Sequence, residues 1–169
     1  MGFVRKLLRR FGLERRDWNA EGRRAGRGAV ALSRKATPAL QGLLRESMNG
    51  EQCFAALCIL AQHCVTSRKM RLSSSNHSAF SQGVASICTP AIATALRVST
   101  DEAGTLYRGA SESISKGPWR IAGAPEEENE KRAVALGILT SFGIAAPNVS
   151  DAAMVLLHAY CQQLLTVGP

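Results

Sequence analysis

Hydrophobic side chains recur at helical spacing over most of the chain, and no segment alternates hydrophobic and polar residues as a strand does. Segments with this spacing follow Pro38, the Asn49-Gly50 turn, the polar stretch 73–77, the capping sequence Ser99–Glu102, Pro125 and Ser150. The sequence therefore predicts an all-α fold, with a compact bundle of five or six helices over residues 38–169.

One of these segments is expected to form the centre of the bundle. Residues 53–65 are apolar on nearly every side of a helix, which is typical of a buried helix. Ser78–Val98 predicts another helix, broken or kinked at Pro90, because proline removes an amide donor and clashes with the preceding turn. We expect His77 to lie in the loop before that helix.

The N-terminus predicts a short basic amphipathic helix that ends at Gly12. Its apolar side chains share one arc of a helical wheel: Phe3, Val4, Leu7, Leu8 and Phe11. Its cations occupy the other arc: Arg5, Lys6, Arg9 and Arg10. Such a segment can bury its apolar side chains at the headgroup boundary while its cations meet anionic lipid, so residues 3–11 are candidate membrane-binding residues. A helix that packs on the protein's own domain would show the same pattern.

The segment that follows combines arginines with glycines and shows little apolar periodicity before Ala29. It is therefore interpreted as a flexible basic linker, which divides the chain into an arm, residues 1–37, and a helical domain, residues 38–169. The cations of the linker are candidate phosphate- or anion-binding residues. They are Arg15, Arg16, Arg23, Arg24, Arg27, Arg34 and Lys35.

Charge follows the same division. The chain of 169 residues has a formal net charge of +8. Residues 1–37 hold eleven Lys and Arg against three Asp and Glu, which accounts for the whole excess, and the remaining residues hold ten of each. An anionic partner is therefore expected to meet residues 1–37.

Cysteine usage and the missing targeting signals indicate the compartment. The five cysteines are odd in number and lie mostly in apolar stretches, and cations interrupt any secretory signal, so free thiols in a reducing compartment are expected. We expect an intracellular protein at the cytoplasmic face of a membrane. A mitochondrial presequence is the alternative, although Glu14, Asp17 and Glu21 are unusual in one.

Three patterns in the sequence contain residues capable of chemistry, and none of them predicts a site. Cys53, Cys58, His63 and Cys64 lack the close pairs of a zinc site, and no signature of a serine or cysteine hydrolase accompanies the histidines. The Gly26–Ala31 segment fits a loose dinucleotide fingerprint but follows no strand. We expect no metal, no cofactor and no enzymatic activity, with His63 and His158 as partly buried helix residues.

The N-terminal sequence Met1-Gly-Phe-Val-Arg-Lys-Leu-Leu-Arg-Arg-Phe-Gly-Leu13, followed by a basic segment and a helical region, resembles the organisation of small RNA-virus matrix and accessory proteins. Rhabdovirus matrix proteins and paramyxovirus C proteins often begin with a similar Leu/Lys-rich basic segment. The resemblance covers residues 1–13, and the chain has no Pro-Pro-x-Tyr motif of the kind that many matrix proteins carry. It implies a membrane-associated matrix or accessory role and assigns no residue beyond the N-terminal segment.

Together these patterns predict a non-enzymatic, membrane-associated adaptor. Its expected partners are an anionic lipid surface and a protein of unknown identity. Assembly into a homo-oligomer is also compatible with the sequence. The alternative is an RNA-binding or capsid-like protein that uses the basic arm on phosphates, with an affinity that falls steeply with salt.

Overall fold

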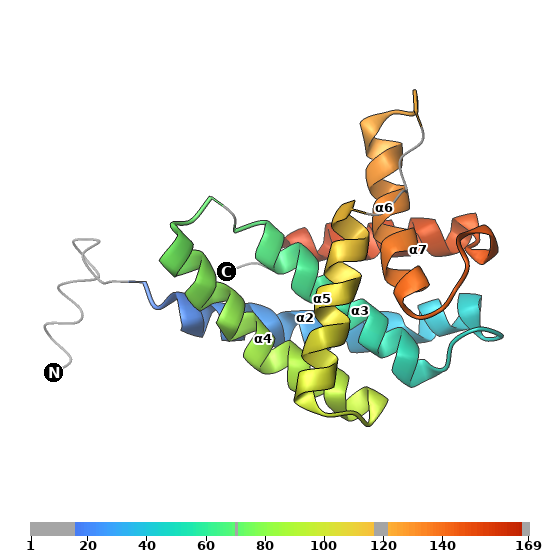
Figure 1. The fold of residues 1–169 in the computed structure, drawn as a ribbon. Helices are drawn as coiled ribbons and strands as arrows, with labels where there is room; N and C mark the ends of the chain where they lie inside the picture. Colours follow the sequence, from blue (N-terminus) through green and yellow to red (C-terminus); the bar gives the residue numbers. More distant parts are fainter. Residues whose placement is uncertain (1–15, 70, 117–121, 167–169) are drawn as a thin grey trace, which may run out of the picture.

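The structure is a computed structural model that describes residues 16–69, 71–116 and 122–166 (Figure 1). It confirms the all-α fold, and its described residues contain no strand. The helices are α2 (Trp18–Leu44), α3 (Gly50–Ser67), α4 (Ser74–Leu96), α5 (Thr100–Lys116), α6 (Glu126–Ser141), the 3-10 turn η1 (Ala146–Asn148) and α7 (Asp151–Thr166).

Helix α3 is the centre of the bundle, as its sequence predicts. It contacts each of the other five α-helices, and its side chains from Ala55 to Ala61 are fully buried. Asn49 begins the helix with a capping box, in which its side chain accepts a hydrogen bond from the Gln52 amide at 2.8 Å and the Gln52 side chain accepts one from the Asn49 amide at 3.0 Å. The hydrophobic core therefore surrounds a helix whose ends are fixed locally.

The prediction of a flexible linker is wrong for residues 18–37, which form most of α2. This helix of 27 residues runs through Pro38 instead of beginning there, and its N-cap is Asp17. Arg34 and Pro38 are both exposed, so the turn in which proline removes an amide donor lies at the surface. The expected boundary at residue 37 thus falls inside a continuous helix.

Small residues along one side of α2 allow this helix to pack closely against α4. Gly22, Ala25, Gly26 and Ala29 lie on one side of α2 and are buried, and α2 packs most extensively against α4. A Cβ atom at Gly22 would lie 2.1 Å from the Phe80 carbonyl oxygen, so only glycine permits this backbone approach. Gly83 of α4 is equally constrained, because its Cβ would lie 2.2 Å from the Asn19 carbonyl oxygen.

Helices α5, α6 and α7 all contact α3 and complete the bundle, and α5 also packs on α4 while α7 also packs on α2 (Figure 1). Helix α5 begins at the expected capping box, where the Glu102 amide donates to the Ser99 hydroxyl at 3.2 Å and the Ser99 amide donates to the Glu102 carboxylate at 2.8 Å. Helices α6 and α7 follow Pro125 and Ser150, as predicted.

Two expectations for α4 are corrected. Of the two expected outcomes at the exposed Pro90, a break or a kink, the break does not occur, because the helix continues through this residue. His77 lies inside the first turns of α4 rather than in a loop, and its Nε2 lies 3.1 Å from the Thr66 carbonyl oxygen. That contact ties the start of α4 to the end of α3.

Among the described residues, α4 is also the one helix whose length and composition would allow it to cross a membrane. A third of its most apolar window is buried in the bundle. The same helix provides the packing surface for α2, so within this fold it is a component of the bundle.

Candidate anion-binding surface

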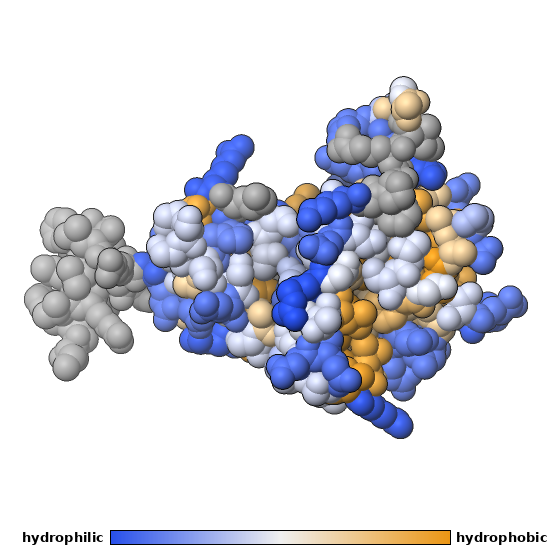
Figure 2. Space-filling model, in the orientation of Figure 1, coloured by the Kyte–Doolittle hydropathy of each residue, from blue (hydrophilic) through white to orange (hydrophobic). Residues whose placement is uncertain are grey.

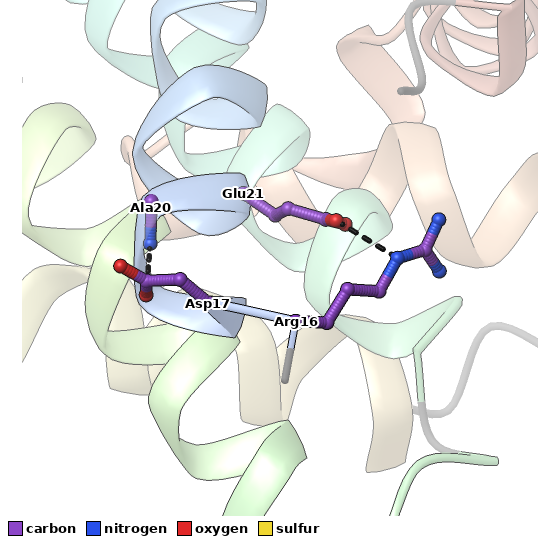
Figure 3. Close-up of polar contacts among 4 residues, drawn as sticks. All are labelled: Arg16, Asp17, Ala20 and Glu21. Carbon is purple, nitrogen blue, oxygen red and sulfur yellow. Dashed lines mark hydrogen bonds and ion pairs between the residues drawn. The ribbon is translucent and has the colours of Figure 1, made fainter. Parts of the chain in front are cut away.

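The first turn of α2 is fixed by polar contacts (Figure 3). The Asp17 carboxylate accepts a hydrogen bond from the Ala20 amide at 2.9 Å, which caps the helix. Arg16 lies beside this turn, and its Nε is 3.1 Å from a carboxylate oxygen of Glu21. The charge of Arg16 is thus compensated within the protein, which sets it apart from the cations that follow.

Five cations of α2 are exposed on the side opposite the buried glycines. We call them the basic face: Arg23, Arg24, Arg27, Arg34 and Lys35. At 100° per residue, Arg23, Arg27 and Arg34 lie within about 40° of one another and all five lie within about 120°. Twelve residue steps separate Arg23 from Lys35, so the face extends about 18 Å along the helix axis.

Little negative charge opposes this face. Glu21 is the only carboxylate in α2, and it is engaged with Arg16. Arg34 lies over the ring of Phe54 at 5.9 Å, and Arg23 donates a hydrogen bond to the Asn19 side chain. Both guanidinium groups are thereby positioned at the surface while they keep their positive charge.

Lys69 adds a cation at the N-terminal end of α2, and the sequence did not identify it. Its ammonium lies 5.9 Å from the ring of Trp18, while Arg16 lies 5.2 Å from the same ring. The contact brings the end of α3 to the start of α2. No sequence pattern could have signalled it, because the two residues are far apart in the chain.

The predicted site residues therefore divide into three groups. The membrane-binding candidates of residues 3–11, from Phe3 to Phe11, and the anion-binding candidate Arg15 lie outside the described residues. Arg16 is paired with Glu21. The other five share one face of α2, which the linker interpretation did not anticipate.

Comparison with known proteins adds no assignment. No family model, curated protein or solved structure matches this chain.

Among the described residues, the groove beside α5 lacks the paired groups that nucleophilic catalysis needs. A groove of about 720 Å³ lies between α5 and the end of α6, beside hydrophobic residues visible in Figure 2. Its two carboxylates come from Asp101 and Glu102 in the first turn of α5, and Glu102 is held by Ser99. No histidine or cysteine lines this groove, so it pairs no nucleophile with an imidazole base.

The histidines occupy structural positions in helices. His63 and His158 are half-buried, as expected. His63 Nδ1 lies 2.7 Å from the Ser111 hydroxyl and thereby links α3 to α5, and burial lowers the pKa of His63. No group of three potential metal ligands occurs in the part of the chain that the structure describes.

Proposed function

We propose that this protein is a non-enzymatic peripheral membrane adaptor that lies on an anionic bilayer through the basic face of α2. The observation that carries the proposal is the alignment of five exposed cations along one helix face without a free carboxylate among them. Each cation near an anionic surface contributes about 1 kcal/mol. A face of this length is sufficient for reversible electrostatic binding.

The N-terminal sequence supplies what α2 lacks. The small residues of α2 are buried against α4, so α2 has no apolar side to insert into lipid. Residues 3–11 directly precede it and combine five apolar side chains with four cations. In this proposal α2 aligns the protein with the bilayer and the N-terminal segment inserts. The matrix or accessory role implied by the N-terminal resemblance belongs to the same proposal.

Among the described residues, α5 and α6 do not contact α2. On a bilayer that touches the basic face, these helices stay available to a protein partner. The adaptor role of the proposal rests on that separation of surfaces.

RNA is the alternative partner of the basic face. Phosphate contacts alone would suit the five cations, but single-stranded RNA is usually also held by aromatic side chains that stack on bases. The ring of Phe54 already lies under Arg34, and the ring of Trp18 already contacts Arg16 and Lys69. The described surface therefore favours the membrane.

Vesicle flotation tests the proposal. The full chain is floated with vesicles of phosphatidylserine and phosphatidylcholine, and with phosphatidylcholine alone. The variant Arg23→Gln/Arg27→Gln/Arg34→Gln is expected to lose binding to the anionic vesicles. The matched control is Arg108→Gln/Lys116→Gln/Lys131→Gln, which removes the same charge from α5 and α6 and is expected to bind like the wild type.

Two outcomes would overturn the membrane proposal. One is equal flotation of all three proteins. The other is affinity of the wild type for RNA, steeply dependent on salt, with no affinity for anionic vesicles; this result would favour the RNA alternative. A further variant, Arg5→Glu/Lys6→Glu/Arg9→Glu/Arg10→Glu, tests the N-terminal segment separately, and unchanged flotation of that variant would restrict the binding surface to α2.

A further inference from the structure

Two cysteines from distant parts of the chain meet at the surface of the bundle. The sulfur atoms of Cys64 in α3 and Cys161 in α7 lie 3.4 Å apart, although 97 residues separate them. Both thiols are free and half-buried, whereas Cys53, Cys58 and Cys88 are buried. The pair is thus different from the three core cysteines in both proximity and exposure.

A cleft gives access to this pair. It has a volume of about 510 Å³ and lies among α3, α5, α6 and α7. Both cysteines line it, together with His63, Arg68 and His158. The cleft therefore provides a route by which a small polar oxidant approaches this pair from solvent.

The surroundings shift the pKa values of the two thiols in opposite directions. A hydrogen bond from the Cys161 thiol lowers the pKa of Cys64, and the positive charge of Arg68 adds to the effect. The same hydrogen bond and burial raise the pKa of Cys161. Cys64 is consequently the thiol that forms a thiolate more readily. Burial raises the pKa of Cys58 to about 11 and that of Cys88 to about 12, so these core thiols are poor nucleophiles.

We propose that Cys64 and Cys161 form a reversible disulfide when the protein meets a hydroperoxide. The Cys64 thiolate attacks the peroxide oxygen, the O–O bond breaks, and the leaving alkoxide or hydroxide takes up a proton. Cys64 is then a sulfenic acid. Cys161 loses its proton and attacks the Cys64 sulfur, and the displaced hydroxide leaves as water. Two thiols are oxidised and one hydroperoxide is reduced to an alcohol or water.

The fold already holds the partners in place for the second step. Arg68 follows α3, and its guanidinium donates to the carbonyl oxygens of Leu164 and Leu165 at the end of α7 at 3.0 and 2.9 Å. The sulfur atoms must approach from 3.4 Å to a bond length of about 2.05 Å. The disulfide would join α7 covalently to the central helix, and a dithiol reductant would release it. The membrane proposal uses other residues and does not depend on this one.

Mass spectrometry of the full chain tests the assignment directly. The protein is treated with hydrogen peroxide, its remaining thiols are alkylated after unfolding, and its peptides are mapped. We expect a product lighter by two hydrogen atoms before alkylation, with three alkylated cysteines and one cross-linked peptide that joins Cys64 to Cys161. A cross-link between other cysteines, or five alkylated cysteines after treatment, would overturn the proposal.

Single variants assign the roles of the two thiols. In Cys161→Ser, dimedone should label Cys64, because the sulfenic acid has no second thiol to resolve it. In Cys64→Ser, Cys161 should stay unlabelled. Labelling of Cys161 with Cys64 unreactive would contradict the assignment of the nucleophile.

Two substitutions of Arg68 test whether its positive charge promotes the reactivity of Cys64. Arg68→Gln is expected to slow the labelling of Cys64 in the Cys161→Ser background by about threefold, because the loss of thiolate outweighs the gain in its nucleophilicity. Arg68→Lys keeps the charge and should restore most of the rate. Equal slowing in both variants would mean that Arg68 acts through its contacts with α7 rather than through its charge.

Discussion

Helices α2 and α3 both cross the bundle, but they are buried by different kinds of residue. Helix α3 fills the centre with large apolar side chains such as Leu57, Ile59 and Leu60. Helix α2 buries mainly glycine and alanine in its first half and presents arginine to solvent on the other side. The difference shows that a helix can be held in a bundle by close backbone contact as well as by large buried side chains. A helix held by small residues, like α2, keeps its opposite face available for charged side chains.

The largest effect on stability is expected in α3. Leu60 is fully buried, so Leu60→Ala should lower the free energy of unfolding by about 3–4 kcal/mol through lost burial and a cavity. Urea unfolding of the full chain measures it. Val155→Ala in α7 is the control, because Val155 is 68% exposed and should change stability by less than about 0.5 kcal/mol. Similar losses in both variants would contradict the central position of α3.

Two glycines of α2 should respond with opposite signs. Gly22→Ala places a methyl group against backbone atoms of α4 and should cost about 2–3 kcal/mol. Gly42→Ala meets nothing within 4 Å and should stabilise the protein by about 0.5–1 kcal/mol, because alanine favours the helix. The same urea experiment compares them. A neutral Gly22→Ala variant would refute the close α2–α4 contact.

A smaller effect is expected where α2 and α3 meet α7. The buried Tyr160 hydroxyl lies 2.7 Å from the Ser33 hydroxyl and donates to the Leu57 carbonyl oxygen at 3.2 Å. Tyr160→Phe should therefore cost about 1 kcal/mol. Ser33→Ala, which leaves the bond to Leu57, is expected to cost less.

We expect the same tyrosine to make the free energy of unfolding depend on pH. Burial raises the pKa of Tyr160 above its ordinary value. The unfolded chain loses this proton near pH 10 while the folded protein keeps it, so the contribution is complete below about pH 10 and is lost as pH rises further. The urea concentration at the unfolding midpoint should fall as pH is raised from neutral to alkaline values. This fall should be smaller in Tyr160→Phe than in the wild type. Equal slopes would contradict the assignment.

The sequence predicted α3, α5, α6 and α7 because apolar periodicity and capping residues mark them. It did not predict α2 over residues 18–37, because glycine and alanine give little hydrophobic signal. The spacing of Gly22, Ala25, Gly26 and Ala29 repeats at three and four residues, and this repeat of small residues was the available signal.

The sequence indicated which cations belong to the candidate surface, but not how they are arranged in space. Charge counting marked the cations of residues 16–35 as candidates, but their alignment on one face follows only from the helix. The contact between Lys69 and Trp18 and the approach of Cys64 to Cys161 depend on tertiary packing. Their separation along the chain left no local pattern to detect.

The most direct test of the central claim is a titration with anionic vesicles that yields partition coefficients. Three cations at about 1 kcal/mol each predict that Arg23→Gln/Arg27→Gln/Arg34→Gln binds roughly 100-fold more weakly than the wild type. Arg108→Gln/Lys116→Gln/Lys131→Gln should stay close to the wild type. Equal partition coefficients for the two triple variants, with both still folded by circular dichroism, would contradict the assignment of α2 as the membrane-binding surface.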